Sequence, residues 1–356
     1  MNITPEILAP ILRDYGISTA ITNIEYFIDR QNPETNNYKI VAKVDVKHRG
    51  PLVLKLIREP GHSHTEIERQ CVFAEHLRRN GIATPEHYSI GGNYCVERTI
   101  DGVRLNVVLE DHAESLTKTV DNDMAREAGK LMARIHRLSF RDNFKIGATT
   151  MWGALGKNSV SGIDSFRELA GHAEASLIKS VSYPHRFCKK PELCREIIAI
   201  YDRKLASAAD VWGRLPCSAV QGDISLGNIY SAGERLGVFD FNNAGDETLI
   251  GDMILEGLTM ANESLLADGL SDSDRPGVFR SFLDGYRAIC PLTPDERMAA
   301  CELYPAYSAL WHTKVEKLAE LMHTPGSCDA ADEMLSAMYE EINSDARKIF
   351  ASELFD

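Results

Sequence analysis

The sequence predicts an α+β fold made of two lobes, a small N-terminal lobe over residues 1–100 and a larger, mainly helical lobe over residues 101–356. Three observations predict it. The chain has 356 residues, which is more than one small core needs. Strand-like segments gather in the first hundred residues. Helical periodicity then dominates, apart from a short interruption at residues 216–245.

The first lobe is predicted to contain an antiparallel sheet and two helices. The first helix has Thr4 as its N-cap and Pro5 in its first turn. Alternating or continuous apolar segments, separated by turn-rich stretches, predict the strands. In chain order we expect a helix (4–15), a three-stranded meander (21–28, 38–46, 51–57), a helix (63–80) and a β-hairpin (86–92 with 93–100). Asp101-Gly102 is interpreted as the break that ends this lobe.

The second lobe is predicted to be helical around one pair of short strands. Helix-like periodicity recurs at 123–138, 163–180, 191–212, 248–268, 275–289, 294–322 and 329–353. Two short apolar runs, 218–223 and 236–241, interrupt the helices and flank a loop at 224–228. No internal repeat or low-complexity tract is present, so a functional site is expected where these two strands meet.

Composition and charge exclude several classes of protein. Hydrophobic residues make up 44% and charged residues 26%, and no run approaches the roughly 18 apolar residues of a membrane span. The N-terminal segment lacks the basic start and apolar core of a signal peptide, so a cytoplasmic location is expected. A net charge of −13 argues against nucleic-acid binding. The eight cysteines form no CxxC pair and are expected to be reduced, mostly buried thiols.

Three polar residues around the interruption suit phosphoryl transfer. Asn228 follows Asp223 by five residues, and Asp240 follows Asn228 by twelve. Phosphoryl transfer needs a carboxylate that accepts the proton of the attacking hydroxyl, a role that suits Asp223. It also needs oxygen ligands for Mg²⁺, and the side chains of Asn228 and Asp240 supply them. A hairpin between the two segments would bring both ligands to one edge. A loop rich in Gly, Asp and Asn with no catalytic role is the alternative.

These motifs resemble those of the aminoglycoside phosphotransferase and choline kinase superfamily. The matching pattern is Gln-Gly-Asp-x4-Asn followed by Phe-Asp-Phe-x2-Ala-Gly-x6-Asp, which ends at Asp252. The helix end at 132–136 resembles a further part of that family, and residues 80–85, which run from Gly81 to Pro85, resemble its glycine-x-proline turn. The resemblance covers roughly residues 20–320 and implies a two-lobed, protein-kinase-like fold.

The resemblance also implies roles for individual residues. Asp223 would be the catalytic base, Asn228 and Asp240 would bind Mg²⁺, and Lys55 would hold the α- and β-phosphates of ATP or GTP. A lysine in an apolar strand requires a partner or a route to solvent. Glu68 on the following helix is the expected partner of Lys55, with Glu66, Glu75 and Gln70 left as alternatives. The Arg98 carbonyl and the Ile100 N–H are expected to bind the adenine.

The sequence departs from the family pattern at two places near this site. Gln221 stands where the family usually has a histidine that braces the catalytic loop, and glutamine is able to donate and accept hydrogen bonds as well. The loop 30–37 contains no glycine, although Asn36 and Asn37 tolerate left-handed backbone.

The acceptor pocket is expected in the helical lobe. Glu256 follows the metal-binding loop, and Tyr304, Tyr307 and Trp311 share one helix face. An aromatic wall with nearby acids would hold an amine by cation–π contact. The alternative is that the three aromatic residues form a packed stripe in the core.

The predicted function is therefore that of a Mg²⁺-dependent phosphotransferase that moves the γ-phosphate of ATP or GTP to a small-molecule hydroxyl. The acceptor would be an aminoglycoside, an amino alcohol or a related metabolite. A protein-modifying kinase is one alternative, which the lack of an Ala-Pro-Glu segment after Asp240 argues against. A catalytically silent nucleotide-binding protein is another, suggested by Gln221 and the glycine-free loop. The sequence predicts no oligomeric state.

Overall fold

The computed structural model describes residues 3–18, 20–114, 119–155, 161–177, 186–263 and 274–351. The chain divides into two compact units. The first unit contains residues 1–119, 131–150 and 219–246, and the second contains 120–130, 151–218 and 247–356. The loop and hairpin at 219–246 thus group with the N-terminal sheet.

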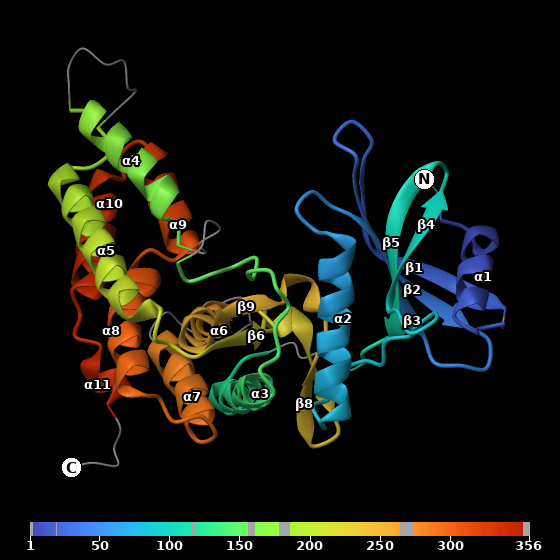
Figure 1. Cartoon of the computed structure of the whole chain (residues 1–356). Helices are drawn as coiled ribbons and strands as arrows, with labels where there is room; N and C mark the ends of the chain where they lie inside the picture. The colour runs from blue at the N-terminus through green and yellow to red at the C-terminus, as the bar shows by residue number, and fades with distance from the viewer. Residues whose placement is uncertain are drawn as a thin grey trace. The chain divides into compact units, whose positions relative to one another are not determined.

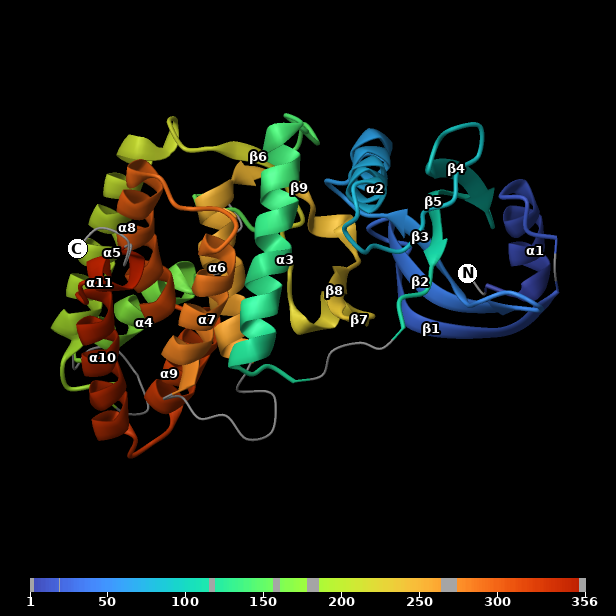
Figure 2. The same cartoon turned by 90° about the horizontal axis from the view of Figure 1, so that it is seen from below.

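The first unit is built on a five-stranded antiparallel sheet in the order β1-β2-β3-β5-β4 (Figure 1). Its strands are β1 (Ile21–Asn32), β2 (Asn37–Val46), β3 (Leu52–Arg58), β4 (Cys95–Ile100) and β5 (Val103–Asp111). Two helices, α1 (Pro5–Asp14) and α2 (His64–Arg79), flank this sheet, and both views show them on opposite sides of it (Figures 1 and 2). The predicted meander and both predicted helices are present.

Strand β3 is buried on both faces, which explains its continuous apolar sequence. Its even-numbered leucines pack with α1 in one core cluster, whereas Ile57 packs with Ile67 and Cys71 of α2 in another. Because successive strand residues point to opposite faces, Lys55 lies on the same face as Ile57.

Asp101-Gly102 is a hairpin turn and does not end the sheet. Ile100 pairs with Val103 directly across it, and Asp101 and Gly102 have φ values of 50° and 78°. Two central residues with positive φ are typical of the tight turns that join antiparallel strands, and Asp-Gly favours them. Of the predicted hairpin of 86–92 with 93–100, a single antiparallel bridge between Ile90 and Asn93 is present. Strand β4 pairs with β5 instead, and a lobe boundary at residue 100 would cut the β4–β5 hairpin.

Two short strand pairs complete the strands of the described residues. They are β6 (Cys217–Val220) with β9 (Gly245–Thr248), and β7 (Ile229–Ala232) with β8 (Arg235–Val238). Short 3₁₀ turns precede β7 (Leu226–Asn228) and follow β8 (Phe241–Asn243). A hairpin was expected in this region and β7–β8 forms it, but the expected single pair of strands is wrong: the two apolar runs do not pair with each other, because β6 pairs with β9 and β8 with β7.

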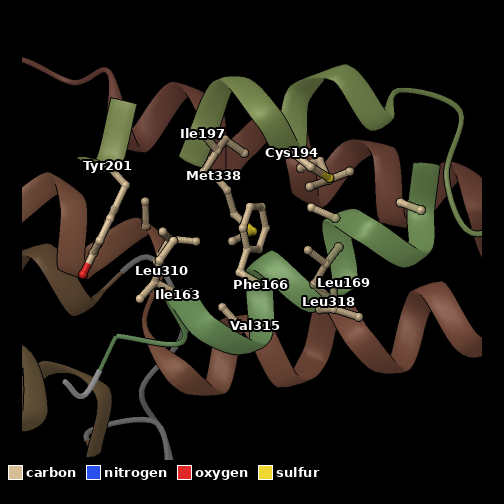
Figure 3. Close-up of a cluster of buried hydrophobic side chains, with 14 of the residues drawn as sticks. Ile163, Phe166, Leu169, Cys194, Ile197, Tyr201, Leu310, Val315, Leu318 and Met338 are labelled. Carbon is tan, nitrogen blue, oxygen red and sulfur yellow. The ribbon is translucent and has the colours of Figure 1, made fainter. Parts of the chain in front are cut away.

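The second unit is helical, as predicted. The helices outside the N-terminal sheet are α3 (Asn122–Arg141), α4 (Ile163–Ala175), α5 (Pro191–Trp212), α6 (Leu249–Glu263), α7 (Arg275–Arg287), α8 (Pro294–Ala309), α9 (His312–His323), α10 (Cys328–Ile342) and α11 (Arg347–Phe350). One core cluster of this unit joins α4, α5, α9 and α10, and Figure 3 shows Phe166 near its middle. The predicted helix 294–322 is two helices, and so is the described part of 329–353. The ends predicted for 163–180, 248–268 and 329–353 lie outside the described residues.

All eight cysteines are free thiols, as predicted, and four of them are buried. No helix among the described residues is long and apolar enough to cross a membrane.

Candidate active site

The loop after β6 takes a backbone shape that only glycine adopts easily. Gly222 has a φ of +74°, and a Cβ added to it would lie 2.7 Å from the Asn243 carbonyl oxygen. The loop carrying Asp223 therefore packs directly against the segment that follows Asp240.

Replacing Gly222 with alanine is expected to lower the melting temperature. A side chain at positive φ costs about 1–3 kcal/mol, and the clash with Asn243 adds to this. The matched control is Gly227→Ala, because a Cβ there would meet only the Ser225 hydroxyl, at 3.8 Å. Equal melting temperatures for the two variants in thermal unfolding would contradict the tight packing of the loop.

Gln221 braces both loops of the site. Its side chain is fully buried, and its amide nitrogen donates to the carbonyl oxygens of Phe239 (3.3 Å) and Asp240 (2.9 Å). Its amide oxygen accepts the N–H of Asp223 at 2.8 Å. The glutamine thus makes the bracing contacts that the sequence analysis expected of this position.

Asp223 is held by two asparagine side chains. Asn243 donates to the Asp223 carboxylate at 2.9 Å, and Asn228 donates to the Asp223 backbone carbonyl at 3.0 Å. Burial raises the pKa of the Asp223 carboxyl above its ordinary range; the Ser225 hydrogen bond opposes this effect and the charge of Asp240 adds to it. A positioned carboxylate with a raised pKa is a suitable proton acceptor.

The β7–β8 hairpin brings Asn228 and Asp240 to the same end. Ile229 pairs with Val238, and the Asn228 carbonyl accepts the Phe239 N–H at 3.0 Å. Asp240 follows with a left-handed φ of 55°, which aspartate tolerates better than most residues. Because the Asn228 amide nitrogen is used by Asp223, its amide oxygen is the group left for a metal ion.

Lys55 pairs with Asp240 and with Glu110 of β5. Its ammonium lies 3.3 Å from an Asp240 carboxylate oxygen and 3.0 Å from a Glu110 oxygen. Burial disfavours the charge on Lys55, but the two carboxylates outweigh burial and hold the pKa of the ammonium above its ordinary value. His87 contacts the other Glu110 oxygen at 2.9 Å.

The predicted partner of Lys55 on α2 is wrong. Glu68 accepts the backbone N–H of Cys95 at 2.6 Å. Of the alternatives, Glu75 accepts hydrogen bonds from Arg78, and Gln70 donates to backbone carbonyls. Besides Asp240, the acid that contacts Lys55 is Glu110 of the neighbouring strand and not a residue of the helix.

The lowered pKa of Glu110 predicts that the protein loses stability in acid. Burial acts to raise its pKa, but Lys55 and His87 outweigh burial and lower the pKa of Glu110 to about 2, from an ordinary 4.5. The resulting stability is fully present above about pH 4.5 and is lost as the pH falls through about 2. A shift of this size corresponds to about 3 kcal/mol. Between pH 5 and 2 the free energy of unfolding, measured with urea, should therefore fall more for the wild type than for Glu110→Gln. Parallel pH dependences of the two proteins would contradict this.

A cavity of about 270 Å³ in the first unit is lined by Lys55, Asn228 and Asp240. Apolar side chains also line the cavity, among them Val41 and Val53 of the sheet and Phe239, directly after β8. The remaining lining residues are Phe27, Ile28, Pro85, Glu110, Asp111, His112, Ala113 and Gly227. Apolar walls with a few polar groups are typical of a small-molecule site.

The predicted adenine-binding groups Arg98 and Ile100 do not line this cavity. Both lie on β4, at the edge of the sheet; the Arg98 side chain pairs with Asp14, and Ile100 packs in the α1 core cluster. Residues 111–113, at the end of β5 and directly after it, line the cavity instead.

The glycine-free loop closes through asparagines. Asn36 has a positive φ of 52°, as the sequence analysis allowed, and the Asn32 side chain accepts the N–H groups of Glu34 and Thr35 at 3.1 and 3.2 Å. The β1–β2 hairpin therefore forms without glycine at its tip.

The predicted acceptor residues are buried in the second unit. Glu256, Tyr307 and Trp311 are 4%, 0% and 3% exposed, and the Tyr307 hydroxyl donates to the Ala154 carbonyl. Tyr307 and Trp311 thus belong to the core, as the alternative interpretation held. Burial leaves these two side chains no surface for an acceptor in this structure.

Comparison with known proteins decides the family. A family model described as "Phosphotransferase enzyme family" matches residues 40–292, well over half of the chain. The chain belongs to the phosphotransferase enzyme family. The predicted resemblance is thereby confirmed. A search of the curated proteins found no match for this phosphotransferase.

Solved structures share the fold of this phosphotransferase at low sequence identity. An amicoumacin kinase, solved with AMP-PNP, Ca²⁺ and Ami, is 11% identical with a TM-score of 0.56, over 89% of this chain and 88% of that chain. A microcompartment-associated aminopropanol kinase is 15% identical with a TM-score of 0.52, over 89% and 90%. A choline kinase from Cryptosporidium parvum Iowa II is 13% identical with a TM-score of 0.50, over 95% of each chain. The predicted kinase-like α+β fold is confirmed.

Sequence reasoning missed Glu110, His87 and Asn243. Glu110 lies in a strand that was not predicted, although the run Val107-Val108-Leu109 and the preceding Asp-Gly were visible signals. Asn243 stands three residues after Asp240 with no local pattern to distinguish it.

Proposed function

We propose that this phosphotransferase transfers the γ-phosphate of ATP or GTP to a hydroxyl of a small molecule with the help of Mg²⁺. The observation that carries the proposal is that Lys55, Asn228 and Asp240 line one cavity, and that the Asn228 side chain is hydrogen-bonded to Asp223. A cation for phosphate, oxygen ligands for a metal and a carboxylate base are the groups that phosphoryl transfer uses. A cytoplasmic location, where ATP is supplied, is part of the proposal.

The residues present fit a magnesium ion. Asp240 offers a carboxylate and Asn228 an amide oxygen, and hard oxygen donors are what Mg²⁺ prefers. When bound, Mg²⁺ neutralises charge on the phosphates of the nucleotide. Gln221 fixes the backbone of Asp240, so the ligand set is held in place before any ion binds.

Asp223 acts on the acceptor. Its carboxylate, fixed by Asn243, accepts the proton of the attacking hydroxyl as the new oxygen–phosphorus bond forms. The bond between the γ-phosphorus and the oxygen that bridges it to the β-phosphate breaks, and the nucleoside diphosphate leaves. Lys55, which lines the cavity, holds the phosphates of the nucleotide in this proposal.

The acceptor class we propose is an amino alcohol, an aminoglycoside or a related metabolite. Support comes from the similar solved structures titled as kinases of amicoumacin, aminopropanol and choline.

Phosphate transfer from γ-labelled ATP and GTP to a panel of amino alcohols and aminoglycosides tests the proposal. We expect labelled product with at least one acceptor, and EDTA should abolish it. Binding of Mg-nucleotide without turnover across the panel would favour the catalytically silent alternative. Absence of Mg²⁺-dependent binding of both nucleotides would overturn the proposal.

A further inference from the structure

We propose that Glu110 of β5 positions the Lys55 ammonium for the nucleotide phosphates, and that His87 holds Glu110 for this task. In this chain the acid that serves Lys55 therefore belongs to the sheet and not to α2. This inference rests on the proposed function, because it assumes that Lys55 meets the phosphates.

Both oxygens of the Glu110 carboxylate are engaged. One lies 3.0 Å from the Lys55 ammonium and the other 2.9 Å from the His87 Nε2. Because an ionised carboxylate only accepts hydrogen bonds, His87 Nε2 is the donor. A carboxylate held at both oxygens cannot rotate away from the lysine. The three side chains are 7%, 4% and 4% exposed, so the ion pair is shielded from water and strengthened.

His87 is itself anchored. Its backbone N–H donates to a Glu75 oxygen at 2.8 Å, and it forms a β-bridge with Glu110. The guanidinium of Arg78 donates to both oxygens of Glu75, at 3.0 Å from Nε and 2.9 Å from Nη2. A chain of contacts thus runs from α2 through Glu75 and His87 to Glu110.

The sheet sets the distance between Lys55 and Glu110. Lys55 is paired with Val108 in the β3–β5 register, and Glu110 follows two residues later on the same face. Diagonal pairs of this kind are within reach of long side chains. The position of the acid relative to the lysine is therefore built into two neighbouring strands.

Gln70 of α2, one of the alternatives to Glu68, is a neutral amide that binds backbone carbonyls. Gln70 is buried, and its side-chain nitrogen donates to the backbone carbonyls of Asn242 and Ala244, both at 3.0 Å. The helix thus holds the segment after Asp240. Since Asp240 is the proposed metal ligand, Glu110 is the carboxylate left to hold Lys55 when a metal is bound.

A double-mutant cycle on nucleotide affinity tests this positioning role. The proteins are wild type, Glu110→Gln, Lys55→Met and the double variant, each titrated with Mg·AMP-PNP by calorimetry. We expect Glu110→Gln to weaken binding about 10-fold to 100-fold when Lys55 is present, because a charge-assisted contact is lost. In the Lys55→Met background the same change should alter affinity less than about threefold.

The matched control is Glu68→Gln, which removes the same charge from the acid first expected to serve Lys55. It should leave nucleotide affinity unchanged. If Glu110 has a purely structural role, Glu110→Gln should weaken nucleotide binding equally with and without Lys55, and that result would overturn the inference. Unchanged nucleotide affinity in Glu110→Gln, or an equal loss of affinity in Glu68→Gln, would also overturn it.

A second variant, His87→Gln, tests the inference independently if Glu110→Gln does not fold. His87→Gln leaves the Lys55–Glu110 pair in place and is expected to weaken binding several-fold, again only when Lys55 is present. Additive effects of His87→Gln and Lys55→Met would overturn the inference. If the wild type itself fails to bind Mg·AMP-PNP, the proposed function fails and this inference with it; additive effects in a wild type that binds overturn this inference alone.

Discussion

Replacing Asp240 with asparagine is expected to reduce Mg²⁺-dependent phosphate transfer about a thousand-fold or more while leaving the fold intact. The substitution removes a charged oxygen ligand, and metal assistance contributes several kcal/mol to such reactions, at about 1.4 kcal/mol for each factor of ten. Asparagine keeps the size of the side chain and tolerates the left-handed backbone of this position. The rate of transfer at saturating nucleotide measures the effect.

Asp101→Asn is the matched control for Asp240→Asn. Asp101 also has a left-handed backbone, with a φ of 50°, but it lies in the β4–β5 turn and does not line the cavity. The control should keep its activity. Normal transfer by Asp240→Asn, or an equal loss in both variants, would refute the assignment of Asp240.

Replacing Asp223 with asparagine is expected to lower kcat by about 10²-fold to 10⁴-fold, the usual contribution of a general base. The amide cannot accept the proton of the attacking hydroxyl. The Kd for Mg·AMP-PNP should stay within a few-fold of the wild type, because the cavity is lined by other residues. Steady-state kinetics and calorimetry measure the two quantities separately.

Asn243→Ala refines this test. It removes only the hydrogen bond to the Asp223 carboxylate, so its kcat should fall between those of the wild type and Asp223→Asn. An unchanged kcat for Asp223→Asn would show that Asp223 is not the base. A loss of nucleotide affinity alone would show that Asp223 binds the nucleotide and does not accept the proton.

The loop and hairpin of the candidate site could be predicted because their information is local. Asp223, Asn228 and Asp240 occupy one loop and one hairpin, whose spacing is readable from the sequence, and the β7–β8 register places the last two at the same end. Lys55 was assigned through the family resemblance, and its place in an apolar strand independently indicated that it needs a partner or a route to solvent. Helix ends marked by capping residues or glycine were also close to the observed ones.

The partner of Lys55 could not be predicted once β5 was missed. Asp101-Gly102 was interpreted as the end of a lobe although it is the turn of a hairpin. That single misinterpretation removed Glu110 from consideration, and it left the adenine contacts expected at Arg98 and Ile100, which lie on the edge strand and do not line the cavity. The pairing of Lys55 with Glu110 depends on which strands are neighbours, which local patterns do not specify.

The second unit shows another limit of sequence reasoning. Helical spacing placed Tyr304, Tyr307 and Trp311 on one face, but it does not tell whether that face meets a cavity or other helices. Tyr307 and Trp311 are buried. The division between α8 and α9 falls at Leu310 and Trp311, where neither glycine nor proline marks a helix end.

The position of a metal ion bound together with a nucleotide tests most directly whether Asn228 and Asp240 bind the metal. Crystals of the protein with AMP-PNP and Mn²⁺ would locate the ion by its anomalous scattering. We expect a peak about 2.1 Å from oxygen atoms of both Asn228 and Asp240, with the nucleotide phosphates beside Lys55. A metal bound away from these two side chains, or a nucleotide outside the cavity that contains Lys55, would contradict it.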